Sequence, residues 1–315
     1  RQGVPVGREV YIGDAPDFAG EEDLNPPALL HRLHLARTRK TPYELACLRE
    51  ANAVAARCHR AAEAAFREGR SEYDIHQAYL AAGELEDADL PYNSIVGLNR
   101  HGAVLHYQQR ERQRPASSDS FLIDAGAMKH AYCSDITRTY TSVEGRFADL
   151  LTALDGLQQR LCACMSKGAD YRDMHLEAHR ALTTVLIDHE LVQCGPAEAL
   201  QKGVSGMFFP HGLGHFLGLQ THDVAGLIED HTGRQIPRPA GHPYLRLTRV
   251  LEPGNVLTVE PGLYFPAGGD KEPNPFTGIG VRIEDDVLVT EDGSENLTGF
   301  LPTSVEEVEE LLLQG

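Results

Sequence analysis

Apolar residues recur at helical spacing in several stretches of the chain. The alanine-rich pattern from Thr41 to about Phe66 is amphipathic. It begins with Thr41-Pro42-Tyr43-Glu44, a capping box with proline at the first helical position. Gly69 follows and ends this helix. The same spacing predicts four more helices, over residues 71–83, 147–165, 171–191 and 304–313.

Short runs rich in β-branched and aromatic residues predict the strands. They are separated by Gly, Asn, Ser and Asp, and they form two groups: 92–99, 103–108, 120–127 and 132–140, then 216–223, 256–264 and 280–289. The order is helix, helix, strands, and then the same again, without a clear sequence repeat. Because the strands come in runs instead of alternating with helices, the pattern favours an α+β fold over a doubly wound sheet.

Residues 1–40 are too few to bury a core of their own. Their pattern fits one strand and a turn over 7–16, then a short helix and a basic connector over 25–40. The chain opens at Arg1 without a methionine, so we expect a piece of a longer product. Residues 41–315 are predicted to form a single domain, because the candidate site residues come from both of its halves.

The composition is that of a soluble globular protein, with 42% hydrophobic and 24% charged residues among 315. The net charge of -17, from 29 basic and 46 acidic residues, argues against nucleic acid and anionic membrane surfaces as partners. No stretch approaches the ~20 apolar residues of a membrane span, and nothing resembles a signal peptide. The six cysteines form no CxxC pair, which indicates free thiols in a reducing cytoplasm.

Four carboxylates and one imidazole are the candidate metal ligands, and each sits in a short strand-like segment: Asp124, Asp135, His215, Glu260 and Glu284. Four negative charges balance two doubly charged cations. Hard oxygen ligands with one nitrogen suit manganese, cobalt or zinc. Without metal, so many acids in one cleft would repel one another and be costly to desolvate.

The position of each acid supports this interpretation to a different degree. Asp124 ends the strand in FLIDAG and, taken alone, is better interpreted as a turn residue at a strand end, but an antiparallel neighbour can place Asp135 on the same face. Glu260 follows three apolar residues of a buried-type strand and needs a partner. Glu284 shares a strand face with Arg282, a natural supporting group. Asp285 and Asp286 are interpreted as bystanders near a turn.

The histidines divide into candidates and decoys. His211-Gly-Leu-Gly-His215 has two glycines, which favour a loop entering a strand over a helix, and His222 follows closely. Three histidines so close together, His211, His215 and His222, are poorly explained as core residues and favour a functional role. His106 alone is weaker support for such a role. On the helix predicted over 171–191, the histidines at 175 and 179 are i, i+4 neighbours, and a solvated face is the preferred interpretation over a metal site.

Five motifs in order carry a family resemblance: LIDAG, YCSDITR, HGLGHFLGLQTHD, TVEPGLYF and GVRIED. Over residues 25–296 the chain resembles the metallopeptidases of the pita-bread fold, and within them the bacterial Xaa-Pro dipeptidases (prolidases). The resemblance implies a pseudo-twofold α+β domain with a metal pair in a central antiparallel sheet. It also implies that 1–40 is the remnant of an N-terminal domain and its linker, and 41–315 the catalytic domain.

The resemblance also implies roles for the candidates. All five acidic and histidine candidates would hold two metal ions, with Asp135 and Glu284 bridging them. A hydroxide between the ions would be the nucleophile. Glu260 would shuttle the proton, and His222 and His106 would stabilise the tetrahedral intermediate or position the substrate.

Four further residues would surround the metal centre. His211 would support the glycine-rich loop at the substrate, Arg282 would hold a ligand, and Tyr92 would lie near the metals. Arg246 would bind the free carboxylate of a dipeptide through its guanidinium fork. A surface arginine near a strand is an equally good interpretation of Arg246 from the residues alone.

We therefore predict a cytoplasmic, homodimeric enzyme that hydrolyses Xaa-Pro dipeptides with two divalent ions, expected to be Mn2+, with Co2+ or Zn2+ as alternatives. Two other functions stay open: an Xaa-Pro aminopeptidase on longer peptides, and a non-catalytic peptide-binding module on the same scaffold. Side activity on organophosphate esters also stays open.

Overall fold

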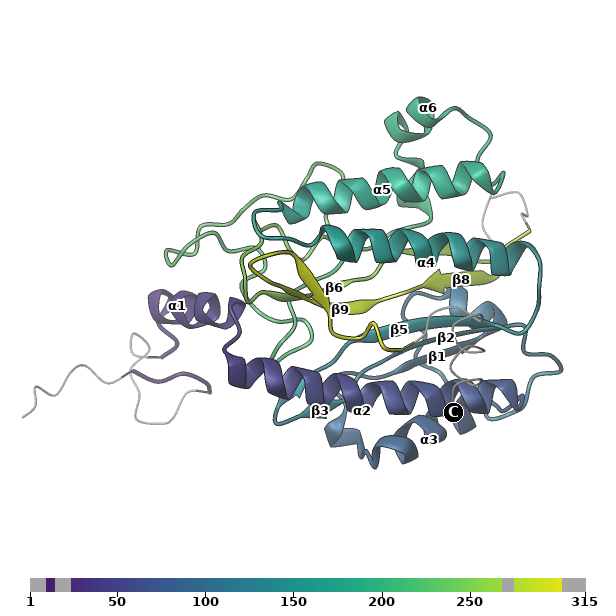
Figure 1. Ribbon diagram of the computed structural model, residues 1–315, viewed down its shortest axis with the longest axis horizontal. Helices are drawn as coiled ribbons and strands as arrows, with labels where there is room; N and C mark the ends of the chain where they lie inside the picture. The colour runs from purple at the N-terminus through teal and green to yellow at the C-terminus, as the bar shows by residue number, and fades with distance from the viewer. Residues whose placement is uncertain (1–9, 15–23, 268–274, 302–315) are drawn as a thin grey trace, which may run out of the picture.

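The computed structural model describes residues 10–14, 24–267 and 275–301. Two pairs of helices lie on opposite sides of the strands (Figure 1). One side carries α2 (Pro42–Arg67) and α3 (Glu72–Gly83), and the other carries α4 (Arg146–Cys164) and α5 (Tyr171–Asp188). The predicted helices 41–66, 71–83, 147–165 and 171–191 are thereby confirmed, whereas the one over 304–313 lies outside the described residues.

The strands of the first half form an antiparallel sheet in the order β1-β2-β5. Its members are β1 (Ile95–Leu98), β2 (Ser120–Ala125) and β5 (Ile136–Thr141). A small hairpin of β3 (Met128–Lys129) and β4 (Tyr132–Cys133) lies between β2 and β5 in the chain. Its tight return fits the turn predicted between Asp124 and Asp135.

The second half has a three-stranded sheet in the order β10-β9-β6 and a two-stranded pair of β7 and β8. The bounds are β6 (Val256–Val259), β7 (Gly262–Phe265), β8 (Ile279–Arg282), β9 (Asp285–Val289) and β10 (Ser294–Asn296). A short α6 (Pro196–Gln201) follows α5. Each half thus contributes two long helices and a set of antiparallel strands, as the α+β pattern predicts.

Helix α2 shows how the sequence sets these elements. The Thr41 hydroxyl accepts a hydrogen bond from the Glu44 amide at 3.3 Å, and Glu44 Oε2 accepts one from the Thr41 amide at 2.7 Å, which completes the capping box. The buried face of α2 is mostly alanine and cysteine. Small side chains let α3 pack closely, and Phe66 and Tyr79 fill the core toward β2.

The two halves meet at a seam between β5 and the segment joining β8 to β9. The Glu284 amide donates to the Thr137 carbonyl at 3.0 Å. Arg138, 1% exposed, donates to the Glu284 carbonyl at 2.8 Å and to Asp285 Oδ1 at 2.7 Å. Asp285 and Asp286 are buried in β9, so their interpretation as bystanders near a turn is wrong.

Two predicted strands are also wrong. Residues 103–108 follow a 3-10 helix (Asn99–Ala103) and form a turn, because His101 and Tyr107 both bond to the buried carboxylate of Glu72, at 2.7 and 2.8 Å. In 216–223 only Phe216 makes a bridge, to Leu257, and the chain then closes back on itself through the Asp223 amide and the Phe216 carbonyl. In the first segment tertiary contacts to Glu72, and in the second a hydrogen bond within the loop, outweigh β propensity.

Helix α1 (Pro27–Thr38) confirms the short helix before the basic connector. Of the strand predicted over 7–16, the described part makes one bridge, between Tyr11 and Leu24. The division between 1–40 and 41–315 stays a prediction. Within the described ranges, no helix combines the length and apolar character that crossing a bilayer requires.

Candidate metal centre and catalytic cleft

A cleft of about 790 Å³ opens between the two halves. Its walls include every residue that the sequence predicts for the site: Tyr92, His106, Asp124, Asp135, His211, His215, His222, Arg246, Glu260, Arg282 and Glu284. These residues come from segments spread over almost 200 positions, and the fold brings all of them to one place.

The first half supplies Asp124 and Asp135. Asp124 lies in β2 directly opposite Thr137 of β5, and Asp135 immediately precedes β5. Tyr92 donates its hydroxyl proton to Asp135 Oδ1 at 2.5 Å, and the Asp135 amide donates to Asp286 Oδ2 at 3.2 Å. Two adjacent antiparallel strands therefore hold both carboxylates toward the cleft, as predicted.

The second half supplies His215 from the glycine-rich loop. The His215 amide donates to Thr258 Oγ1 at 3.1 Å, and the Thr258 amide donates to the His215 carbonyl at 2.9 Å. A Cβ at Gly214 would stand 2.1 Å from the Thr258 carbonyl oxygen, so only glycine allows the loop to lie this close to β6. This contact positions the imidazole, whose Nε2 is 3.2 Å from Asp135 Oδ2 and 3.7 Å from Glu260 Oε1.

Glu284 completes a compact group with Asp135 and His215. One ligand atom from each of these three residues lies within 4.8 Å of the others, and all three side chains are buried. Glu284 Oε2 accepts a hydrogen bond from the Thr137 hydroxyl at 2.6 Å. The carboxylate is thus fixed in orientation by a neighbour on the opposite strand.

The acids of this group have pKa values that burial drives upward. Burial and the neighbouring carboxylates raise the pKa of Glu284 well above its usual value. Burial raises that of Glu260 to about 7, and burial also raises that of Asp124 against the opposing effect of Arg282. Burial alone lowers the pKa of His215, but Asp135 and Glu260 outweigh it and raise the pKa.

Such a site suits divalent cations. The buried Asp124 Oδ1 has no hydrogen-bond partner within the described ranges, and at least three converging acids are destabilised as anions. Bound cations offset this repulsion, and the oxygen-rich donor set with one imidazole matches manganese, cobalt or zinc. The residues present therefore fit the predicted metal group.

The remaining candidates line the cleft around this group. His211 contacts Tyr264 through Nε2 at 3.1 Å, and its Nδ1 is 3.5 Å from Glu260 Oε2. Burial lowers the pKa of His222 to about 3, aided by His215 and Arg246, so the imidazole is neutral. His106 and Arg246 are exposed at the cleft wall. No carboxylate of the described residues forms an ion pair with Arg246.

The sequence matches metallopeptidase family M24 over residues 46–291. The chain belongs to this family. The predicted resemblance is confirmed, and the M24 fold is the pita-bread α+β fold. Because M24 is a family of metallopeptidases, membership implies divalent metal ions, and the acidic group in the cleft is the candidate site for them.

Two relatives show the similarity within M24. The chain is 49% identical to an Xaa-Pro dipeptidase of Stenotrophomonas maltophilia strain R551-3 over 292 residues, which cover 87% of this chain and 66% of that protein. It is 50% identical, with the same coverage, to an Xaa-Pro dipeptidase of Xanthomonas euvesicatoria pv. vesicatoria strain 85-10. The chain therefore spans 66% of the length of these curated relatives.

Solved M24 structures have the same fold. Aminopeptidase P from E. coli in a low pH form has a TM-score of 0.76 at 32% identity, covering 90% of this chain and 61% of that one. Proline aminopeptidase P II from Yersinia pestis has a TM-score of 0.72 at 31% identity, with 90% and 62% covered. Both relationships extend over both halves of the pita-bread domain.

Sequence reasoning missed three residues that support the candidate ligands. Thr137 bonds to Glu284 and also accepts a hydrogen bond from Arg282 Nε at 3.1 Å. The Tyr264 hydroxyl accepts a hydrogen bond from Arg282 Nη1, and Asp286 orients the backbone before β5. The period of two along Asp135-Ile-Thr137 was the available signal, because it puts both side chains on one strand face.

Arg282 lies where the sequence predicts a supporting group, although its carboxylate partner differs from the expected one. Its Nη2 pairs with Asp124 Oδ2 at 2.5 Å, and it reaches Glu284 only through the Thr137 hydroxyl. The guanidinium is buried and has acceptors on three sides. It therefore links acids of both halves of the M24 domain.

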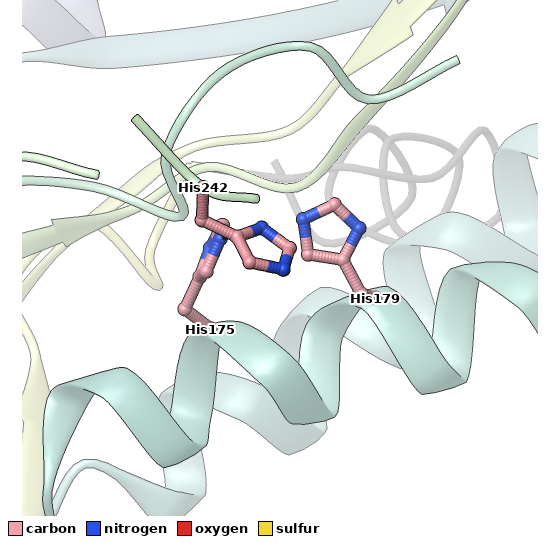
Figure 2. A group of neighbouring side chains, drawn as sticks. All are labelled: His175, His179 and His242. Atoms are coloured by element: carbon pink, nitrogen blue, oxygen red, sulfur yellow. Dashed lines mark hydrogen bonds between the residues drawn. The ribbon is translucent and has the colours of Figure 1, made fainter. Parts of the chain in front are cut away.

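The interpretation of His175 and His179 as a solvated helix face is wrong. They are 1% and 8% exposed, because the segment containing His242 covers this face of α5 (Figure 2). His175 Nε2 is 2.9 Å from His242 Nδ1. The three rings form a cluster outside the M24 ligand set.

Proposed function

We propose that this chain is the catalytic part of an Xaa-Pro dipeptidase, which hydrolyses the bond between an amino acid and a C-terminal proline with the help of divalent metal ions. The observation that carries the proposal is the cleft itself, in which the five candidate metal ligands face the same space as Arg246, an arginine without an ion pair among the described residues. The relatives that are 49–50% identical and bear this name support it.

The metal-holding residues in this proposal are Asp124, Asp135, His215, Glu260 and Glu284. They would hold two divalent ions, with Mn2+ as the first expectation and Co2+ or Zn2+ as alternatives. When bound, such ions lower the pKa of water and polarise a carbonyl group. Arg282, which pairs with Asp124, and Thr137, which bonds to Glu284, would keep these carboxylates oriented.

Protons move through Glu260. Burial raises the pKa of this carboxyl to about 7 when no ion is bound; beside the ions, its carboxylate would accept a proton from water in the cleft and return it to the leaving amine. His222 is neutral in the cleft, and with His106 it offers N–H groups toward the oxygen that gains charge during attack. His211 and Tyr92 keep Glu260 and Asp135 in place through the contacts described above.

Dipeptide length is selected by Arg246 in this proposal. Its guanidinium is exposed at the cleft wall and matches a carboxylate fork. A dipeptide presents its C-terminal carboxylate one residue beyond the scissile bond, whereas a longer peptide presents a neutral amide there. The competing function, Xaa-Pro aminopeptidase on longer peptides, is favoured by the solved structures with 30–33% identity, all of which are aminopeptidases.

Hydrolysis of an Xaa-Pro dipeptide and the matching Xaa-Pro-Yaa tripeptide, with Mn2+ and with a chelator, tests the proposal. We expect Mn2+-dependent cleavage of the dipeptide, and little of the tripeptide. Preferred cleavage of the tripeptide would make the protein an aminopeptidase. Failure with both substrates, in a chain that still binds Mn2+, would favour the peptide-binding alternative.

Two variants assign the residues. Asp135→Asn should abolish hydrolysis, because it removes a charged ligand, and near-normal turnover would exclude Asp135 from the metal group. Arg246→Ala should impair dipeptides selectively, mainly through KM, with Arg246→Lys in between. The exposed Arg234 provides the matched control as Arg234→Ala. Equal losses on dipeptide and tripeptide would contradict the carboxylate role.

The cellular setting is part of the proposal. All six cysteines are free thiols, which supports the reducing environment of the cytoplasm. The net charge of -17 supports small peptides over nucleic acids or anionic membranes as partners. A homodimer is expected, and light scattering coupled to gel filtration measures it.

A further inference from the structure

Three histidines gather next to the cleft-lining segment 243–246; none of them lines the cleft or belongs to the acidic group. His175 and His179 lie one turn apart on α5, and His242 reaches them from the loop that ends near Arg246 (Figure 2). Each pair of ring centroids is 4.6 Å apart. One ring nitrogen from each residue lies within 4.8 Å of the other two.

The surroundings leave few polar partners for these rings. His179 Nδ1 is 2.9 Å from the Ser205 hydroxyl, which leaves Nε2 as its free nitrogen. The buried His175 Nδ1 has no partner within the described ranges, and no acid there pairs with any of the three rings. Phe209 packs against His175 and His179, with ring centroids 6.0 and 4.9 Å away. The cluster therefore has two buried rings and one half-buried ring, and no acid among the described residues pairs with them.

We propose that His175, His179 and His242 bind one transition metal ion of the zinc type, separate from the acidic metal centre. Three imidazoles are a donor set that zinc, nickel and copper accept, with a fourth position open to water. The Ser205 hydroxyl fixes the orientation of the His179 ring, as outer groups do at metal-bound histidines.

The geometry needs only a small adjustment. At Zn–N distances of about 2.0–2.1 Å, tetrahedral ligand nitrogens stand about 3.3 Å apart. His175 Nε2 and His242 Nδ1 are 2.9 Å apart, and all three candidate atoms are within 4.8 Å, so each nitrogen–nitrogen distance must change by at most about 1.5 Å. His242 is half-buried on a loop and can make this movement.

Protonation does not compete with the ion near neutral pH. Burial, with the neighbouring rings of His179 and His242, lowers the pKa of His175 to about 2. Burial, with His242, lowers that of His179 to about 4, and burial lowers that of His242. All three lone pairs are available for an ion at neutral pH.

An ion at this site would cross-link helix α5 to the loop of His242. That loop continues directly into Pro243, Tyr244 and Arg246, which line the cleft. The site would therefore hold the cleft wall against the helix layer. This inference does not depend on the proposed peptidase activity, because it concerns only the binding of an ion.

Counting bound zinc tests the site. The full chain is freed of metal with a chelator, equilibrated with micromolar zinc, and analysed by plasma mass spectrometry. Wild type should bind one zinc more per chain than His242→Ala, whose half-buried loop position tolerates truncation. His231→Ala, which removes an exposed histidine outside the cluster, should match wild type. Equal zinc content in wild type and His242→Ala would overturn the proposal.

A second variant and a crystal locate the ion. His179→Gln should lose the same single equivalent, and retention of that zinc would show that the three residues do not form the site. Anomalous diffraction at the zinc edge should give a peak about 2.0–2.1 Å from one nitrogen of each ring. A peak at any other group of side chains, with none in the cluster, would also contradict the proposal.

Discussion

Replacing Thr137 with valine removes one hydroxyl from the centre of the site and keeps the branched shape of the side chain. That hydroxyl donates to Glu284 Oε2 at 2.6 Å and accepts from Arg282 Nε at 3.1 Å. Thr137 is fully buried, so no solvent replaces the lost contacts. Thr137→Val should therefore let the Glu284 carboxylate turn away from its position beside Asp135.

Two effects follow, with different magnitudes. Hydrogen bonds to charged groups contribute about 1.5–3 kcal/mol each, so the two bonds set an upper limit of about 3–6 kcal/mol on the loss of folding free energy. Loss of a group that orients a metal ligand lowers metal affinity by about 10–100-fold. This corresponds to about 1.4–2.8 kcal/mol in binding free energy.

Calorimetric titration with Mn2+ after chelator treatment measures the second effect, and urea unfolding without metal measures the first. Thr137→Ser restores the hydroxyl and should recover most of the affinity. Thr139→Val is the matched control, because its hydroxyl bonds only to the backbone of Arg282, at 2.8 and 3.1 Å. If Thr137→Val binds Mn2+ as tightly as wild type, the hydroxyl does not orient Glu284.

Three further outcomes are expected. Gly214→Ala should destabilise the fold by about 1–3 kcal/mol in urea unfolding and weaken metal binding in Mn2+ titrations, because its Cβ would lie 2.1 Å from a β6 carbonyl oxygen. Gly206→Ala should be neutral in both assays, because a Cβ at that position meets no atom within 4 Å. After metal removal, the free energy of unfolding should fall as pH rises from about 4.5 to about 7, because folded Glu260 keeps a proton that the unfolded chain releases. Melting temperatures measured with chelator should show this slope, and Glu260→Gln should reduce it. A free energy of unfolding that rises with pH would contradict the reasoning. Arg138→Met should lower the free energy of unfolding by about 3–5 kcal/mol in urea, because it leaves Asp285 buried without its cation. The double variant Arg138→Met, Asp285→Asn should recover part of this loss. If it recovers none, the unpaired Asp285 charge is not the cause.

The sequence predicts the candidate site better than it predicts the strands. Glu260 stands out because a carboxylate after three apolar strand residues needs a partner, and the fold places His215 Nε2 3.7 Å from it. Residues 103–108 have strand-like composition, but the buried carboxylate of Glu72 in α3 accepts a hydrogen bond from the Tyr107 hydroxyl, 35 positions along the chain. A contact of this kind is not visible in a local pattern.

The histidine cluster shows the same limit from the other side. The spacing of His175 and His179 indicates a shared helix face, and a local pattern cannot say what covers that face. The cover comes from His242, 67 positions from His175, in a loop without periodicity. Burial of that face is therefore a tertiary property, and the expectation of a solvated face failed for that reason.

The seam between Thr137 and Glu284 also sets the order in which the protein can become active. The two residues are 147 positions apart, so their contact forms only after a long loop has closed. Asp124 and Asp135 are translated well before His215, Glu260 and Glu284, and the early residues alone make an incomplete ligand set. Under the proposed function, a chain still leaving the ribosome is therefore inert toward peptides, and hydrolysis begins only when the second half has folded onto the first.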